Sequence, residues 1–221
     1  MKQEPEFDNL DERIRYYELL LEQDLKNLPE YPLPPGYRFV FYRPGDRDSW
    51  IAIEQSAKEF STCQQGLEAW GRYFGGYEDI LPNRMIFLEN EAGEKVATAS
   101  AYFDVIRGDP SGAGWVHWVA VRRDHQGRGL SKPLVARALK TLGSLGYTHA
   151  KIPTQTTSWV AVKVYLDLGF RPIPQNAVHS RDGWRIVKAL TGHPALAEFD
   201  AAGEEEILAV PVERREDNAG L

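Results

Sequence analysis

The sequence has little cysteine, little excess positive charge and no long apolar run. Cys63 is the single cysteine among 221 residues, so a disulfide scaffold within the chain is excluded. The formal net charge is −6 and the pI is near 5.5, which argues against a general binder of nucleic acid or of a membrane surface. No apolar run approaches the roughly 18 residues of a membrane span, and the polar residues 1–9 are unlike a signal peptide. These absences together predict a cytoplasmic protein.

The composition is that of a globular protein. Hydrophobic residues make up 43% of the chain and aromatic residues 11%, which is enough for a packed core. The length suggests one domain of about 150 residues with appendages. We expect an amphipathic helix and a Pro-rich linker over 1–35, the main domain over 36–192, and an acidic tail over 193–221.

The N-terminal helix is predicted over residues 10–28. Its apolar residues recur at spacings of three and four, and Pro29 begins a run of prolines that ends the pattern. Such a helix either packs on its own domain or forms a dimerisation surface.

The rest of the chain predicts an α/β fold. Strands and helices alternate in an order typical of a mixed sheet with helices on both faces. The expected strands are 37–43, 85–88, 96–105, 115–122, 149–154 and 170–173, and the expected helices are 46–60, 64–77, 134–142, 158–168 and 181–190.

The most informative stretch joins the strand at 115–122 to the next helix through the loop at 126–131. The first backbone N–H groups of a helix have no partner within it and suit an anion. Gly127 and Gly129 allow the backbone to approach a phosphate, and Pro133 suits a first helical turn. The alternative is an ordinary turn with solvated arginines. Neither the Walker pattern nor the dinucleotide fingerprint is present.

The segment Gln126-Gly127-Arg128-Gly129-Leu130-Ser131 resembles the Q/R-x-x-G-x-G/A pyrophosphate motif of the GNAT superfamily of acyl-CoA N-acyltransferases. The segment 158–170 resembles the N-x-x-A-x-x-x-Y-x-x-x-G-F segment of the same family. Ser131 departs from Gly or Ala, and Ser158 departs from Asn. The resemblance covers about residues 37–190.

The resemblance implies a mostly antiparallel sheet of six to seven strands, splayed between the family's fourth and fifth strands. It implies transfer of an acyl group, acetyl first among them, from coenzyme A to an amine. The alternative is a non-catalytic acyl-CoA sensor, which the two serine departures favour. The residues implied to bind the cofactor are Val119, Ala120, Val121, Gln126, Gly127, Arg128, Gly129, Leu130, Ser131, Lys132 and Ser158.

Pro153 independently indicates the splay. Proline lacks the N–H that a central strand needs, so we expect strands 115–122 and 149–154 to diverge near it. Tyr165 matches the family tyrosine that protonates the departing thiolate, and a neutral phenol suits this role. The alternative is that Tyr165 is a packing residue on a helix face.

His117 is the candidate base, because it is the ionisable residue in an otherwise apolar strand and has a suitable pKa. A core histidine or a chain of waters are the alternatives. Weaker polar candidates for the acceptor site are Glu54, Asp104 and Gln155. Four aromatic residues are candidates to line it, or else to form core: Trp70, Tyr73, Phe74 and Trp118.

No metal site is expected, because the histidines and Cys63 lack zinc-ligand spacing. The predicted partners are acetyl-CoA and a small-molecule or peptide amine, and neither a nucleic acid nor a membrane. A homodimer through the N-terminal helix is a further expectation.

Overall fold

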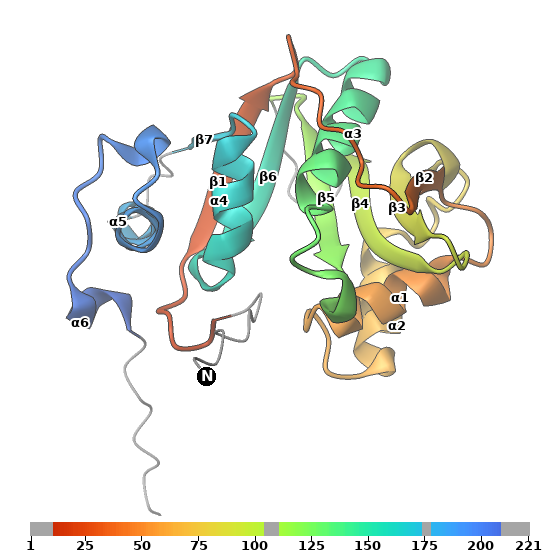
Figure 1. Ribbon diagram of the computed structural model, residues 1–221, viewed down its shortest axis with the longest axis horizontal. Helices are drawn as coiled ribbons and strands as arrows, with labels where there is room; N and C mark the ends of the chain where they lie inside the picture. The colour runs from red at the N-terminus through yellow and green to blue at the C-terminus, as the bar shows by residue number, and fades with distance from the viewer. Residues whose placement is uncertain (1–10, 104–110, 174–177, 209–221) are drawn as a thin grey trace, which may run out of the picture.

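The computed structural model describes residues 11–103, 111–173 and 178–208. Within these ranges, seven strands form one sheet in the order β2-β3-β4-β5-β6-β1-β7 (Figure 1). All neighbouring strands are antiparallel except β5 and β6, which are parallel. The mixed, mostly antiparallel sheet is therefore confirmed. The strands are β1 (Glu18–Asp24), β2 (Tyr37–Phe41), β3 (Met85–Asn90), β4 (Lys95–Phe103), β5 (Gly114–Val121), β6 (His149–Gln155) and β7 (Arg171–Pro172).

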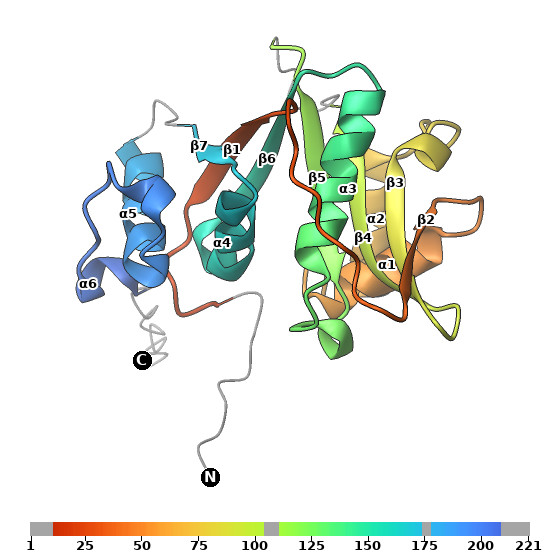
Figure 2. The same ribbon diagram turned by 45° about the horizontal axis from the view of Figure 1, so that its top comes forward.

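Helices cover both faces of the sheet, as predicted (Figures 1 and 2). α1 and α2 pack on one face, and α3, α4 and α5 pack on the other. The helices are α1 (Arg47–Ser56), α2 (Cys63–Tyr73), α3 (Ser131–Ser144), α4 (Trp159–Asp167), α5 (Val178–Thr191) and the short α6 (Glu204–Ile207). In the described part of the chain, 3-10 turns lie between them at Leu81–Asn83, Arg123–His125, Thr156–Ser158 and Pro194–Leu196.

Each face of the sheet has its own core. The core under α3, α4 and α5 is mainly aliphatic, whereas the core under α1 and α2 is aromatic. In the aromatic core the fully buried Trp50 ring lies 5.4 Å from the Phe74 ring and 5.1 Å from the Trp118 ring, measured between centroids. Trp70 and Phe74 are buried here, so they are core residues. The aromatic core fixes α1 against β5, and this packing positions one side of the site described below.

The predicted helix over 10–28 is wrong. Residues Glu18–Asp24 form strand β1, which lies inside the sheet between β6 and β7. Its register with β6 runs from Glu18 opposite Gln155 to Asp24 opposite His149. The segment is therefore part of the sheet, and the helix on which a dimer was expected does not form.

Pairing explains why the strand replaces the helix. β1 bonds to a strand on each of its edges, so tertiary contacts override the helical spacing. Leu19 and Leu21 are buried in the aliphatic core, and Leu20 packs towards the aromatic core. A strand covered on both faces has such a continuous apolar run.

The segment after β1 crosses the outside of α3 before β2 begins (Figures 1 and 2). Residues 28–34 have neither helix nor strand, as the prolines predicted. Glu30 pairs with Lys140 of α3, and the Tyr31 hydroxyl donates to the Asp167 carbonyl at 3.5 Å. The N-terminal segment thus ties α3 to α4.

The beginning of the expected acidic tail packs against the domain. Leu196 and Phe199 are buried in the aliphatic core, and His193 Nε2 lies 3.1 Å from Asp167 Oδ1. Leu208 forms an isolated bridge with Ile14. Residues 209–221 lie outside the described residues.

Candidate active site

The site begins where β5 and β6 separate. These parallel strands share two residue pairs in their register, Gly114 with Ala150 and Trp115 with Lys151. Beyond Trp115 the strands diverge, as Pro153 predicted. Among the described strands, none therefore pairs with the edge of β5 that faces β6 from Val116 onwards.

The register of β1 with β6 shows why Pro153 is tolerated. The Thr156 N–H donates to the Tyr17 carbonyl at 3.0 Å, and antiparallel pairs alternate between bonded and non-bonded. Leu20 and Pro153 are therefore a non-bonded pair, and the Ile173 N–H accordingly reaches the Leu20 carbonyl from β7. The Pro153 nitrogen faces β5 across the gap, where no ladder hydrogen bond is lost.

A bulge in β5 lies directly at this gap. The register with β4 passes from Thr98 opposite Ala120 to Ser100 opposite His117. Trp118 and Val119 thus have no partner in the described register, and Trp118 has a φ of 52°. Positive φ is strained for a bulky residue and persists where packing enforces it. The bulge re-aims the backbone of Val119, as a donor to a bound carbonyl would require.

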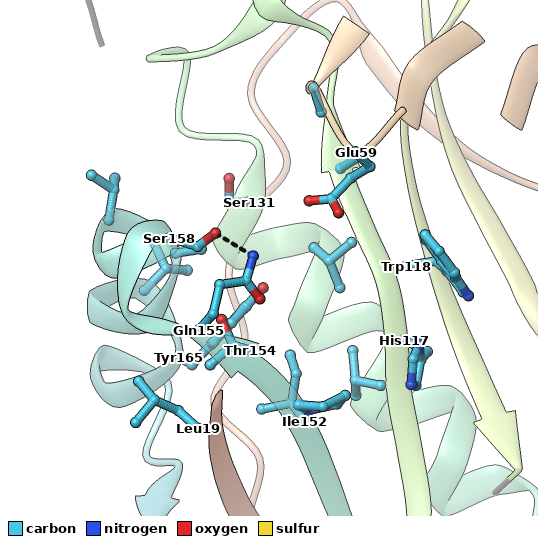
Figure 3. Close-up of a pocket in the computed structure, with 18 of the residues that line it drawn as sticks. Leu19, Glu59, His117, Trp118, Ser131, Ile152, Thr154, Gln155, Ser158 and Tyr165 are labelled. Carbon is cyan, nitrogen blue, oxygen red and sulfur yellow. Dashed lines mark hydrogen bonds between the residues drawn. The ribbon is translucent and has the colours of Figure 1, made fainter. Parts of the chain in front are cut away.

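A cavity of about 260 Å³ fills the gap. It is bounded by β5 on one side and by β6 and α4 on the other (Figure 3). Seven residues from the sequence-based predictions line it: His117, Val119, Ala120, Val121, Ser131, Ser158 and Tyr165. Tyr73, Trp118, Glu54 and Gln155 of the acceptor-site candidates also line it. Asp104 lies outside the described residues.

The loop at 126–131 stands at one end of this cavity, because Ser131 lines the cavity and begins α3. Gly127 and Gly129 have φ values of 72° and 75°, so glycine is favoured by conformation at both positions. No side chain caps the N-terminus of α3. Its first N–H groups and the helix dipole therefore suit a phosphate.

The polar side chains of the loop are held by the protein. Gln126 Nε2 donates to the Val121 carbonyl at 3.0 Å, which fixes the exit from β5. Arg128 donates to the Asp124 carbonyl at 2.8 Å and to the Tyr37 hydroxyl at 3.2 Å. Lys132 pairs with Asp167 at 3.0 Å. These bonds pre-order the loop and place positive charge around it.

Ser158, the other departure from the family pattern, is buried and accepts a 2.9 Å hydrogen bond from Gln155 Nε2 (Figure 3). It joins the end of β6 to the start of α4. A hydroxyl is thus accommodated where Asn is usual, and Ser158 itself lines the cavity.

Tyr165 of α4 is 6% exposed and lines the cavity. Burial raises the pKa of its phenol, and the charges of Glu59 and Glu54 raise that pKa further. The phenol therefore stays protonated well above neutral pH. Such a group can donate a proton to a departing anion.

His117 lies among aromatic rings. Its ring centroid is 5.6 Å from that of Tyr73, 5.4 Å from that of Tyr102 and 6.0 Å from that of Trp118. Figure 3 shows His117 on the far side of β5 from Tyr165. His117 is half-buried, lines the cavity and also lies beside rings of the aromatic core.

Sequence reasoning did not identify Glu59 and gave Glu54 only as a weaker candidate for the acceptor site. Glu54 is fully buried and Glu59 points its carboxylate into the gap (Figure 3). Glu54 lies four residues after Trp50 and three before Ala57, so it shares the apolar stripe of α1. An acidic residue on such a stripe was the available signal. Glu59 lies beyond the helix, and no periodicity indicates it.

The described residues contain no group of three or more His, Cys, Asp or Glu that could hold a metal ion. None of their helices is long and apolar enough to cross a membrane.

The sequence comparisons agree with this geometry. The model of the acetyltransferase (GNAT) family matches residues 47–170. The mycothiol acetyltransferase of Pseudarthrobacter chlorophenolicus is 29% identical over 148 residues, which are 65% of this chain and 45% of that protein. The mycothiol acetyltransferase of Actinosynnema mirum is 28% identical over 153 residues, 68% of this chain and 50% of that protein. The chain thus spans about half the length of the curated relatives it matches.

Solved structures share the fold. A GCN5-related N-acetyltransferase from Sphaerobacter thermophilus has a TM-score of 0.56 at 20% identity, covering 73% of this chain and 49% of that one. A GNAT-family acetyltransferase from Colwellia psychrerythraea has a TM-score of 0.55 at 13% identity, covering 73% of this chain and 55% of that one. At these identities the likeness concerns the fold alone.

Proposed function

The chain belongs to the acetyltransferase (GNAT) family, and from this premise we propose that it transfers an acetyl group from acetyl-CoA to an amine. One observation carries the proposal. The unpartnered edge of β5 forms one wall of a cavity that has an anion-binding helix N-terminus at one end and Tyr165 in its opposite wall.

The residues present fit coenzyme A. The amides of Gln126–Ser131 would hold the diphosphate, with Arg128 and Lys132 adding positive charge nearby. The free edge of β5 would pair with the amide groups of the pantetheine arm, as an added strand would. Ala120 and Val121 supply part of that edge, and Ser158 lies on the opposite wall.

Two groups would assist the chemistry. The N–H of Val119, freed by the bulge, would donate to the thioester oxygen as negative charge develops there. The Tyr165 phenol would give its proton to the sulfur as the C–S bond breaks. Both groups belong to the walls of the same cavity, which supports the assignment.

The amine acceptor is supported by the relatives. The sequence relatives are described as mycothiol acetyltransferases, and a structural neighbour is described as a glucosamine N-acetyltransferase region, with a TM-score of 0.52 at 17% identity. Those descriptions concern proteins of which this chain matches only a part. We therefore infer an amine acceptor as a class.

The alternative proposal is a non-catalytic acyl-CoA sensor, which Ser131 and Ser158 favour. Calorimetry with coenzyme A, followed by detection of thiol release from acetyl-CoA with a panel of primary amines, separates the two. A transferase binds coenzyme A and releases thiol only when an amine is present. Binding without amine-dependent release would establish the sensor, and absence of binding would exclude both.

A further inference from the structure

The end of α1 brings two carboxylates together. Lys58 has a φ of 70°, the Glu59 N–H donates to the Glu54 carbonyl at 3.0 Å, and the Lys58 N–H donates to the Gln55 carbonyl at 3.0 Å. These two bonds define a Schellman motif, in which the side chains at the Glu54 and Glu59 positions usually make a hydrophobic contact. Here both positions are glutamate.

The burial of Glu54 has no structural compensation. Glu54 is 0% exposed, and neither of its carboxylate oxygens has a hydrogen-bond partner among the described residues, whereas Glu59 is exposed. A buried carboxyl without a partner is costly, and its persistence calls for an explanation. Glu59 lies beside the gap, and its carboxylate points into the cavity (Figure 3). Both residues line the cavity, and the pair thus forms an acidic part of its wall.

The charge of the cavity has one sign. Among the described residues that line it, none is Lys or Arg, whereas Glu18, Glu54 and Glu59 are acidic. The other titratable groups that face it are Tyr16, Tyr73, His117 and Tyr165. Arg128 of the 126–131 loop and the adjacent Lys132 are not part of this lining. An anionic donor therefore suits the loop, and a cationic acceptor suits the cavity.

We propose that Glu59, positioned by Glu54, binds the ammonium group of a primary amine acceptor and takes its proton. The inference rests on the proposed acetyl transfer and names its acceptor class: an alkylamine that is protonated in solution and has an apolar or aromatic body. Tyr73 and Trp118, which line the same cavity, would cover that body and face its positive charge.

The proton balance of the step is complete. The ammonium gives one proton to the Glu59 carboxylate, and the neutral nitrogen then forms the C–N bond as the C–S bond breaks. Tyr165 gives its proton to the sulfur and recovers one from the acylated nitrogen. Glu59 releases the first proton to solvent, so one proton leaves per turnover.

The electrostatics agree with this division of roles. The Glu59 side chain is exposed, yet its desolvation beside the cavity raises the pKa of its carboxyl, which brings a carboxylate base closer to neutral pH. Burial raises the pKa of Glu54 well above its usual range, and the charge of Glu59 adds to this. The pKa is raised more strongly at the fully buried Glu54, so Glu59 is the more readily ionised of the two. Glu54 acts through Glu59 and is a positioning residue.

The test compares a cationic amine with an uncharged one. The probes are 2-phenylethylamine, which is an ammonium at neutral pH, and aniline, which is not. Glu59→Gln should lower kcat/KM for 2-phenylethylamine by about 10²-fold or more and remove the acidic limb of its pH profile. The loss with aniline should be under about tenfold, because aniline needs no deprotonation before attack. Glu59→Asp should recover part of the activity.

Controls separate this role from folding and from His117. Calorimetry with coenzyme A should give an unchanged affinity for Glu59→Gln, and Glu22→Gln on β1, outside the cavity, should behave as wild type. Glu54→Gln should shift the acidic limb without removing it. Wild-type activity in Glu59→Gln, or loss of the acidic limb in His117→Gln alone, would overturn the inference. A wild-type protein that releases no thiol with either amine would overturn the proposed function itself.

Discussion

At the scale of single residues, the site depends on a raised pKa and on strained backbone angles that the surrounding structure maintains. The Tyr165 phenol is kept neutral by burial and by two glutamates. Trp118 keeps a positive φ in the middle of a strand, and Gly127 keeps one in the loop. Each of these conditions comes from surrounding structure, so each can be removed by one substitution.

Replacing Tyr165 with Phe should lower kcat by about 10²-fold, because the sulfur would leave without a proton donor. The affinity for coenzyme A should change by less than about twofold, since the ring and its packing remain. Steady-state kinetics and calorimetry measure the two quantities. Tyr147→Phe, in a tyrosine away from the cavity, is the matched control. Equal kcat in Tyr165→Phe and wild type would remove the role.

Gly127 and Gly143 form a second matched pair. An added Cβ would meet nothing within 4 Å at either position, but only Gly127 has a positive φ. Gly127→Ala should destabilise the fold by about 1–2 kcal/mol and weaken coenzyme A binding. Gly143→Ala, inside α3, should stabilise the fold by about 0.5–1 kcal/mol. Urea unfolding measures both, and equal shifts would show that φ is not the cause.

At the scale of elements, β1 shows where the sequence misleads. The spacing of apolar residues over 10–28 fits a helix. Only pairing with the distant strands β6 and β7 selects a strand instead. Most other elements could be predicted, because their periodicity and their glycine and proline boundaries are local signals. The loop at 126–131 and Tyr165 were found through motifs. Glu59 could not be found in this way. Its position depends on how α1 ends and on the packing of that end beside strands that are distant in sequence.

The contribution of β1 can be measured at neighbouring positions. Leu21 is fully buried and Glu22 is exposed. Leu21→Ala should lower the free energy of unfolding by about 2–5 kcal/mol, through lost burial and a cavity. Glu22→Ala should change it by less than about 0.5 kcal/mol. A free terminal helix would respond weakly at both positions, so a small loss at Leu21 would contradict the assignment of β1 to the sheet.

At the scale of the whole molecule, charge is separated along the cleft. The chain is acidic overall, yet basic residues surround the loop at one end and glutamates line the cavity beside it. Burying Glu54 lowers the free energy of unfolding, and the size of this effect should depend on pH.

Glu54 has a raised pKa in the folded state, whereas the unfolded carboxyl titrates near pH 4.3. Below that pH both states are protonated and nothing is lost. As the pH rises towards the folded pKa, only the unfolded state ionises, so stability falls by up to about 1.4 kcal/mol per pH unit. Glu54→Gln should lack this loss. Urea unfolding at pH 5 and pH 8 tests this, and parallel curves for both proteins would refute it.

The position of β1 also determines when the protein can fold during its synthesis. β2 to β5 are consecutive in the chain and can pair as soon as they leave the ribosome. β1 leaves first, but its partners β6 and β7 are among the last strands made. Until then its three leucines have no sheet to enter and are available to chaperones or to aggregation. The half of the sheet on which α4 and Tyr165 pack can therefore close only after residue 172 has emerged, by a non-local and slow step.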